Sequence, residues 1–238
     1  MESPINCFDC KNQQCLIKSC DESWIEHLSR IKNQTVYPKE AFVFRQGEQV
    51  EGIFFIQAGK VKVTSTTTQG HEQIVRLASD GHILGHRGYG NEAYPINAIT
   101  MEPSRICFVD NDTLYQAFME NPSFTFELMM FYSRELRKTE QIKKYLTQMN
   151  NEEKVAFSLI YILERFGFED PEKGTIPSCV SRMDMAKIIG TNNEQVSRAI
   201  TQLREKGIIT TYRRQIAILE HQNLKNLIRP YYSLREPA

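Results

Sequence analysis

The chain has 238 residues, with 29 Lys and Arg against 29 Asp and Glu, and 41% of its residues are hydrophobic. This size and composition suit one large or two modest folded domains and exclude a disordered or collagen-like chain. No apolar run approaches the roughly 18 residues that a membrane span needs, and residues 1–4 do not begin a secretory signal. We therefore expect a cytoplasmic protein with no membrane association.

The neutral total hides an uneven distribution of charge. From residue 181 to the C-terminus there are ten basic and five acidic residues, a net charge of +5, so the preceding part of the chain is acidic. A locally basic segment is typical of a domain that meets nucleic acid, because phosphate groups attract clustered Lys and Arg. The neutral total therefore does not exclude a nucleic-acid partner.

The N-terminal segment is rich in cysteine. Its first 20 residues hold four of the six cysteines: Cys7, Cys10, Cys15 and Cys20. If the six were spread evenly along the chain, the expected number in this segment would be about 0.5. In a reducing cytosol, thiols at short spacing bind metal more often than they form disulfides. The arm therefore predicts a metal or cluster site, with zinc and a thiol–disulfide switch as open alternatives.

Strand patterns dominate the next part of the chain. Apolar residues at helical spacing first predict a short helix over residues 23–32. Glycines then separate segments rich in Val, Ile, Phe and Thr. These segments predict four strands, over residues 53–57, 61–66, 73–77 and 104–109. Regular turns of this kind indicate an antiparallel roll or barrel. Cys107 lies inside the last strand, where a cysteine by itself is more often a small buried hydrophobe than a ligand.

The period changes after the roll. Over residues 123–149 the apolar side chains recur every three or four positions and no Pro or Gly interrupts them, which predicts one long helix. Its seam is only partly apolar, so two arrangements stay open: pairing with a second copy, and packing against the chain's own roll. A further helix is predicted over residues 153–166, capped by Asn150 or Asn151.

The basic C-terminal region carries the pattern of two short helices joined at a glycine. Ser181 caps the first helix in a capping-box pattern, and Gly190 ends it. Asn192 or Asn193 caps a second helix that reaches Lys206. The spacing of apolar residues on both helices predicts a shared buried face.

Four polar residues point outward from the second predicted helix: Glu194, Ser197, Arg198 and Thr201. Side chains of these types hydrogen-bond the edges of bases in the major groove. Two short strands, over residues 208–211 and 215–219, flank Arg213 and Arg214 and predict a basic hairpin that meets phosphate. The alternative is a solvated helical hairpin without a specific partner, but the local positive charge favours DNA.

The order of roll, long helix and C-terminal helix-turn-helix resembles the bacterial transcription factors of the cyclic-AMP receptor protein and fumarate-nitrate reduction regulator family. Residues 194–198, Glu-Gln-Val-Ser-Arg, resemble the Glu-x-x-Ser-Arg recognition motif of the fumarate-nitrate branch. The resemblance implies that Glu194, Ser197 and Arg198 read a TTGAT-like half-site, twice per homodimer. It also implies double-stranded DNA and RNA polymerase as partners.

The same resemblance implies an α+β fold in four parts. Residues 1–20 would form a cysteine-rich sensory arm, and residues 21–120 an antiparallel β-roll of the jelly-roll type, like a cyclic-nucleotide-binding domain. Residues 121–150 would form a dimerisation helix, and residues 151–238 a winged helix-turn-helix that binds DNA. The resemblance covers nearly the whole chain.

Within this family the cysteines resemble an oxygen sensor. Three arm cysteines and one on a roll strand are similar to the set that holds a 4Fe-4S cluster in the fumarate-nitrate regulator: Cys7, Cys10, Cys15 and Cys107. The interval between the second and third arm cysteines, Cys10 and Cys15, is one residue shorter here than in that regulator. That difference leaves Cys20 as an alternative third ligand from the arm.

Residues of the same roll bear on two other signals, cyclic AMP and haem. Cyclic-nucleotide members of the family carry a Gly-Glu pair and a later Arg-Ser, whereas this chain has Gly85-His86 and lacks the later Arg, which argues against cyclic AMP. His71, His82 and His86 offer axial ligands for a haem sensor, although we expect them to be surface histidines. A zinc, thiol-switch, haem or small-molecule sensor on the same fold stays open.

The sequence does not predict an enzyme, because no nucleophile with its base, pair of catalytic carboxylates or phosphate loop occurs at recognisable spacing. An electron-transfer iron–sulfur protein is the competing class, since a cysteine arm could hold a redox cluster without any DNA function. Specific binding to duplex DNA separates the two, and the helix-turn-helix pattern favours regulation.

Overall fold

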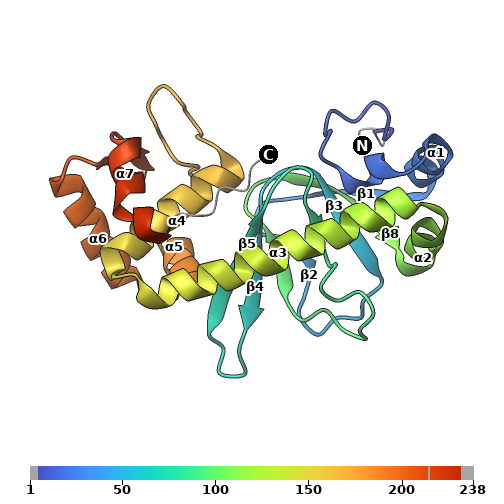
Figure 1. The fold of residues 1–238 in the computed structure, drawn as a ribbon, viewed down its shortest axis with the longest axis horizontal. Coiled ribbons are helices and arrows are strands. Elements are labelled where there is room, and N and C mark those ends of the chain that lie inside the picture. The colour runs from blue at the N-terminus through green and yellow to red at the C-terminus, as the bar shows by residue number, and fades with distance from the viewer. Residues whose placement is uncertain (1–4, 214, 232–238) are drawn as a thin grey trace. The chain divides into compact units, whose positions relative to one another are not determined.

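The computed structural model describes residues 5–213 and 215–231 of the chain. The chain divides into two compact units, Met1–Arg134 and Glu135–Ala238. Figure 1 shows a region of strands and a cluster of short helices, with one long helix running from the first unit into the second. None of the described helices combines the length and apolar character that a membrane crossing demands.

The first unit begins with the cysteine arm. The arm leads into a short 3-10 helix, η1 (Leu16–Ser19), and then into helix α1 (Glu22–Ile31), which confirms the helix predicted from residue 23. Ile25 and Leu28 are buried on one side of α1. This apolar stripe holds α1, and with it the end of the arm, against the strands that follow.

The strands of the first unit form two antiparallel four-stranded sheets, in the orders β1-β8-β3-β6 and β2-β7-β4-β5. Their bounds are β1 (Asn33–Tyr37), β2 (Phe42–Phe44), β3 (Gly52–Ala58), β4 (Val61–Thr66), β5 (Glu72–Ala78), β6 (Ile83–Leu84), β7 (Asn97–Thr100) and β8 (Ser104–Asp110). Each strand predicted from the sequence is present, as β3, β4, β5 and β8. The predicted antiparallel roll is therefore confirmed.

The other four strands escape the sequence pattern for physical reasons. β6 has only two residues, and all four residues of β7 are buried, so neither shows the alternation of apolar and polar side chains that marks a half-buried strand. β1 is short and begins with three polar residues. β2 has only three residues, and its pairing with β7 shifts register between Phe42 and Phe44. Their place depends on partners far away in the sequence.

The sheet that contains β8 has a core on each face. Ile106 packs with Ile56 in the core between the two sheets. Its neighbour Cys107 packs on the opposite face, together with Phe55 and residues of the arm and α1. This follows from the strand geometry, in which successive side chains point to opposite faces. The arm therefore covers the outer face of the sheet, and Cys107 lies beneath it.

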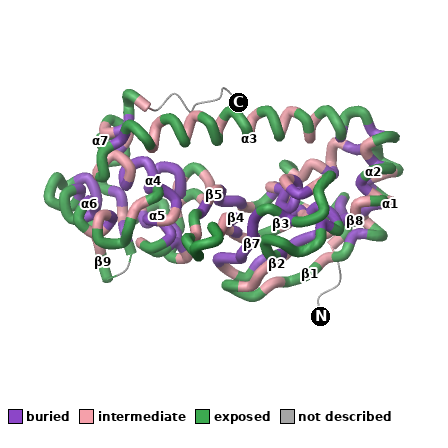
Figure 2. Tube along the Cα trace, turned by 90° about the horizontal axis from the view of Figure 1, so that it is seen from below, coloured by how far each residue is buried: buried purple, intermediate pink, exposed green. Residues whose placement is uncertain are grey.

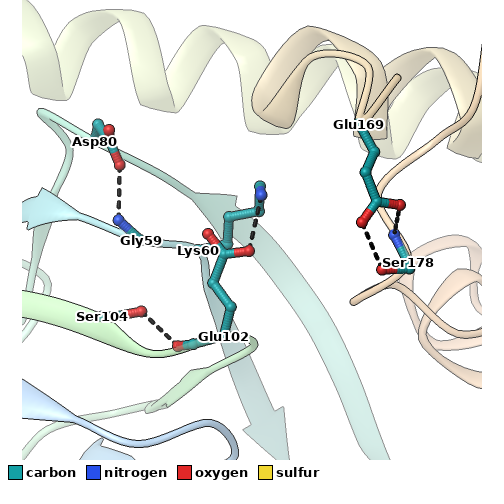
Figure 3. Close-up of polar contacts among 7 residues, drawn as sticks. All are labelled: Gly59, Lys60, Asp80, Glu102, Ser104, Glu169 and Ser178. Carbon is teal, nitrogen blue, oxygen red and sulfur yellow. Dashed lines mark hydrogen bonds and ion pairs between the residues drawn. The ribbon is translucent and has the colours of Figure 1, made fainter. Parts of the chain in front are cut away.

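A glycine turn joins β3 to β4. Gly59 has a φ of +130°, and a Cβ there would lie 2.2 Å from Oγ of Ser104, so a residue with a side chain does not fit. The Gly59 N–H donates to Oδ1 of Asp80 at 2.8 Å. Lys60 pairs with Glu102 at 2.8 Å, and the Ser104 hydroxyl donates to the Glu102 carbonyl (Figure 3). These contacts fix the hairpin against the start of β8.

Two helices follow the roll. α2 (Asn111–Glu120), which the sequence pattern did not predict, is capped by Asp110, whose side chain accepts the Thr113 N–H. α3 (Pro122–Gln148) confirms the predicted long helix, and it begins at a proline, which needs no amide partner in the first turn. Figure 2 shows that α3 is exposed or half-buried along most of its length.

The second unit holds the remaining elements: α4 (Asn151–Phe166), α5 (Arg182–Ile189), α6 (Asn193–Glu205), β9 (Ile209–Tyr212), β10 (Gln215–Ile218), α7 (His221–Leu227) and η2 (Arg229–Tyr231). Asn150 caps α4 in a capping box with Glu153, and β9 pairs with β10 as the predicted hairpin. Within the loop before α5, Glu169 accepts two hydrogen bonds from Ser178 (Figure 3). The predicted helix-turn-helix and wing are present.

Candidate functional site

Four of the cysteines line one pocket in the first unit: Cys7, Cys10, Cys15 and Cys107. Three come from the arm and the fourth from β8. Cys20 is absent from the described lining, because η1 turns the chain between Cys15 and Cys20 and leaves Cys20 buried at the start of α1. The four thiols of the primary prediction thus share one pocket. Cys20 lies outside its lining but near it, since burial, Asp21 and the neighbouring Cys15 and Cys7 raise the pKa of its thiol to about 12.

The sheet positions Cys107 at the floor of the pocket. It lies opposite Gln34 of β1 and opposite Phe55 of β3 in the two antiparallel pairings of β8. Phe55 and Gln34 line the same pocket. Because β8 is hydrogen-bonded on both sides, the backbone of Cys107 is rigid, whereas the other three thiols belong to an irregular segment.

Specific hydrogen bonds fasten the arm over this floor. The Cys7 N–H donates to Oγ of Ser29 on α1 at 2.9 Å. The Ile5 N–H donates to Oε1 of Gln34 at 3.0 Å, and Nδ2 of Asn12 donates to the Ile56 carbonyl at 3.2 Å. These contacts connect the arm to α1, β1 and β3 by polar side chains rather than by a strand pairing.

Two polar side chains donate directly to sulfur. Nζ of Lys32 lies 3.3 Å from Sγ of Cys7, and Nε2 of Gln34 lies 3.3 Å from Sγ of Cys107. Donors at this position stabilise a thiolate or a metal-bound sulfur. Neither residue is predictable from the sequence, because a Lys after a helix and a Gln in a short strand carry no distinguishing pattern.

The electrostatic environment of the thiols is set mainly by burial. Burial, with a smaller contribution from the neighbouring Cys107, Cys7 and Cys10, raises the pKa of Cys15 to about 12. Burial also raises the pKa of Cys107, while the Gln34 amide and the Lys32 ammonium act in the opposite direction. Cys7 and Cys10 therefore influence both Cys15 and Cys107, as expected of side chains that share one small space.

The cavity between the four thiols is small, about 20 Å³, which is room for one water molecule. A larger group enters only when the arm moves outward. Among the described residues, no three His, Cys, Asp or Glu side chains converge closely enough to hold a single metal ion. The thiols surround a space rather than meet at a point, and four sulfur donors of this kind suit zinc or an iron–sulfur cluster chemically.

The surface position expected for the histidines is wrong for His86. Its side chain is only 3% exposed, because the loop before β7 folds under α3 and the ring packs edge-on to Phe131 and Tyr132. The Tyr132 hydroxyl donates to the His86 carbonyl at 2.6 Å. Burial holds the pKa of His86 well below its usual value, and the cations Arg76 and Arg87 lower it further.

The helix-turn-helix lies in the second unit. Ser181 caps α5 in a full capping box with Asp184, as predicted, and Gly190 ends the helix in the left-handed conformation at a φ of +67°. Asn192 caps α6 by accepting the Gln195 N–H at 2.9 Å. Buried residues of both helices form the shared apolar face. Local signals in the sequence therefore place α6.

α6 presents the predicted polar residues to solvent. Glu194, Arg198 and Thr201 are exposed, and Ser197 is half-buried. The carboxylate of Glu194 and the guanidinium of Arg198 form an ion pair one turn apart. The pair holds both side chains on the outer face of the helix before any partner is bound. The polar face and the buried face of α6 thus lie where the spacing predicts them.

Contacts from α4 hold α6 in place. Nδ2 of Asn151 donates to Oε1 of Gln195 at 3.0 Å. Nζ of Lys206 pairs with the carboxylate of Glu152, at 2.6 Å and 2.8 Å to its two oxygens. The N-terminal turn of α4 therefore contacts both ends of α6. These contacts are not predictable from the sequence, since they join residues far apart in the chain.

The wing carries an exposed cation close to α6. Arg213 adopts a positive φ of 55° in the turn between β9 and β10, and its guanidinium lies 5.5 Å from the ring centroid of the exposed Tyr212. Arg214, also predicted to meet phosphate, lies outside the described residues. A basic, aromatic turn of this kind suits a phosphate backbone.

The fold and these two sites define a class of protein: a DNA-binding transcription regulator that combines an antiparallel β-roll with a helix-turn-helix. Residues 34–121 match the model of the cyclic nucleotide-binding domain, and residues 153–227 match the Crp-like helix-turn-helix domain. The chain belongs to the Crp/Fnr family of transcription regulators, which confirms the resemblance stated from the sequence. It is accordingly a regulator and not an enzyme.

Individual relatives agree over most of the chain. The transcriptional activator protein anr of Pseudomonas aeruginosa is 27% identical over 217 residues, 90% of this chain and 89% of the relative. The fumarate and nitrate reduction regulatory protein of Escherichia coli is 24% identical over 225 residues, 94% and 90% of the two chains. The structure of FixK2 from Bradyrhizobium japonicum shares the fold, with a TM-score of 0.73 at 24% identity over 83% of this chain and 97% of that one.

Proposed function

We propose that this regulator responds to oxygen or redox state through a 4Fe-4S cluster held by four thiolates and binds a TTGAT-like palindrome as a homodimer. The observation that carries the proposal is the shared pocket of Cys7, Cys10, Cys15 and Cys107. The names of relatives support it, because fumarate and nitrate are respiratory electron acceptors that replace oxygen.

The donor set favours a cluster over a single ion. Zinc in a structural site needs four ligands that meet at one point, with each sulfur about 2.3 Å from the metal. A cube instead spreads its thiolate ligands around its corners. Three thiols on an irregular arm and one on a fixed strand match the second arrangement, because the arm can move outward and close over the cube. Zinc and a thiol switch are the outcomes against which the proposal is tested.

The chain's own residues fix how the arm responds. When bound, the cluster supplies an oxygen-sensitive tie between the arm and β8. Gln34 holds both sides of that tie, since its amide donates to Cys107 and its carbonyl oxygen accepts the Ile5 N–H. Without the tie, the arm is left with hydrogen bonds such as that of Asn12 to Ile56, which open far more easily than a metal–sulfur bond.

α6 is the proposed reader of DNA. Glu194 and Arg198 suit a cytosine amino group and a guanine edge, respectively, and Ser197 lies between them. Thr201 extends this face by one turn, and Arg213 on the wing, with Arg214, would contact phosphate. Two copies of α6 in a dimer would enter major grooves about 34 Å apart and read the two halves of the palindrome. RNA polymerase is the proposed partner of the DNA-bound dimer.

α3 is the proposed dimerisation element. Phe126, Met129 and Leu136 are exposed by 54%, 55% and 63%, and their spacing places them on one side of the helix. Large apolar side chains on one exposed helix face are typical of a surface that pairs. Sedimentation of the full chain should give a dimer, and Leu136→Glu should give a monomer. A wild-type chain that sediments as a monomer would contradict the pairing.

The roll is proposed to act as a scaffold without cyclic AMP. His86 stands where cyclic-nucleotide members carry a carboxylate, and it is buried against Phe131 and Tyr132 of α3. A neutral ring in an aromatic environment offers no cradle for a cyclic phosphate, which needs fixed charged or backbone donors. Titration calorimetry with cyclic AMP should therefore detect no binding.

The cluster is tested by purifying the chain without oxygen. We expect iron and sulfide in the protein, no stoichiometric zinc, and specific binding to duplex DNA that carries the palindrome. Exposure to air should then remove both the cluster and the DNA affinity. Zinc without iron would overturn the cluster, and redox exchange without DNA binding would instead support an electron-transfer protein.

A further inference from the structure

Lys32 is a buried cation beside the thiol pocket. It follows α1 directly, its side chain is only 8% exposed, and it lines the pocket. Its ammonium donates to the Ile5 carbonyl at 2.8 Å and to the carbonyl and hydroxyl of Ser29 at 3.4 Å and 3.3 Å. A lysine is seldom buried this deeply without an anionic partner, because desolvation penalises the charge.

In the part of the chain that the structure describes, the one hydrogen-bond partner of Lys32 that can become an anion is sulfur. Its remaining contact is Sγ of Cys7, at 3.3 Å. Within residues 5–213 and 215–231, no carboxylate pairs with this ammonium. The backbone carbonyls and the Ser29 hydroxyl satisfy its hydrogen bonds but do not neutralise it. Among the described contacts of Lys32, the buried charge is therefore matched when the Cys7 sulfur carries negative charge.

We infer that Lys32 is the outer-sphere cation of the cluster site, a positioning residue that acts through the Cys7 sulfur. This role rests on the proposed function, since it requires a cluster on the four thiolates. Four thiolates and an iron–sulfur cube together form an anion, and one-electron reduction makes that anion more negative. A buried ammonium at hydrogen-bonding distance favours the more negative state and disfavours loss of an electron to oxygen.

Lys32 would therefore help to set how readily oxygen oxidises the cluster. Positive charge near a cluster raises its reduction potential, and so do hydrogen bonds to its sulfurs. Lys32 supplies both at Cys7, whereas Gln34 supplies only a neutral hydrogen bond at Cys107. The arm would therefore hold its cluster more firmly in air than four cysteines alone would. Lys32 also donates to the Ile5 carbonyl of the arm. This contact keeps the Lys32 ammonium and the Cys7 sulfur close together.

The test compares substitutions at Lys32 in the full chain, purified and loaded with iron and sulfide without oxygen. Lys32→Met should lower the reduction potential of the bound cluster and speed its loss in air by about tenfold or more, the usual scale of an outer-sphere change. Lys32→Arg keeps the charge and should restore much of both values. Lys32→Gln keeps a donor without the charge, so its potential should lie above that of Lys32→Met but well below that of Lys32→Arg.

The matched control is Lys11→Met, the same substitution on the same arm. Lys11 is adjacent to Cys10 but exposed, so solvent screens its charge and both readouts should equal those of the wild-type chain. Far-UV circular dichroism checks the fold of each variant. If Lys32→Met does not fold, the comparison of Lys32→Gln with Lys32→Arg decides.

The outcomes separate this inference from the function on which it rests. A wild-type chain that takes up no iron and sulfide removes the cluster, and with it both proposals. A wild-type chain with a full cluster, beside a Lys32→Met chain of equal potential and equal lifetime in air, overturns only the role of Lys32. Equal defects in Lys32→Arg and Lys32→Met also overturn it, because they would indicate packing rather than charge.

Discussion

The thiol pocket and the recognition helix are built in opposite ways. The pocket is lined by an irregular arm, the residue after α1 and three strands, so that Cys7 and Cys107 come together from distant parts of the chain. The recognition helix is local: Asn192 caps it, and Glu194 and Arg198 pair across one turn. The pocket is buried and depends on sulfur, whereas the helix presents its polar side chains to water.

This difference separates the proposed sensing of oxygen, at the thiol pocket, from the reading of DNA by α6. A buried site formed by distant segments comes apart when one tie is lost, since each segment has few other contacts. A capped helix with its own buried face keeps its shape whether or not a partner is present. The molecule therefore places its labile chemistry where the fold is non-local and its base-reading residues where the fold is local.

Cys107→Ala should have the largest effect on the pocket. The substitution removes the thiol on the rigid strand, so the cluster should be lost, while a single small change at a buried position costs about 1 kcal/mol of stability. Iron and sulfide assays on protein purified without oxygen measure the first effect, and urea unfolding measures the second. A variant that keeps a full cluster would remove Cys107 from the site.

Cys20→Ala is the companion change. Cys20 is also a buried cysteine of the arm region, but it does not line the pocket. We expect this variant to keep its iron and sulfide and to lose them in air at the wild-type rate. Loss of the cluster here, with retention in Cys15→Ala, would instead identify Cys20 as the third arm ligand.

Arg198→Ala should have the largest effect on the recognition helix. The side chain is exposed on α6, so the fold should be unchanged, and the cost should be about 1 to 3 kcal/mol on the cognate duplex alone. Fluorescence anisotropy with cognate and scrambled duplexes measures this difference. Arg204→Ala, which removes an exposed arginine near the end of the same helix, serves as the control. Equal losses on both duplexes would contradict base reading by Arg198.

The recognition helix could be predicted almost completely from the sequence, because its signals are local. The caps Ser181 and Asn192 and the stop at Gly190 each act within a few residues, and the structure has all three in these roles. What the sequence did not predict is the support from α4. The pair of Glu152 and Lys206 joins positions whose proximity only the fold creates.

The pocket was predictable in its donors but not in its surroundings. Cysteine spacing identified the candidates, yet only the turn of η1 separates Cys15 from Cys20. Lys32 and Gln34 gave no signal at all, since their importance lies in where β1 and α1 bring their side chains. The buried position of His86 was missed for a related reason: residues of α3, far along the chain, cover it.

Ser181→Ala tests how local the helix-turn-helix is. The Ser181 hydroxyl accepts the Asp184 N–H at 3.0 Å and donates to the Asp184 carboxylate at 2.6 Å. Loss of this cap should lower the free energy of unfolding by about 1 kcal/mol. Urea denaturation of the apoprotein measures it, and Ser181→Asp, which also caps, should be close to wild type. Unchanged stability in the alanine variant would indicate that packing alone places α5.

Lys206→Ala should have the smallest effect, and it tests the long-range tie of the reader. The pair with Glu152 is half exposed at the lysine, so its removal should cost less than about 1 kcal/mol. A double-mutant cycle with Glu152→Gln isolates the interaction from other losses at either position. The coupling should shrink in 1 M salt, since screening weakens partly exposed pairs. A coupling well above 1 kcal/mol would mean that the recognition helix, like the pocket, depends on a distant contact, and the contrast between local reader and assembled sensor would fail.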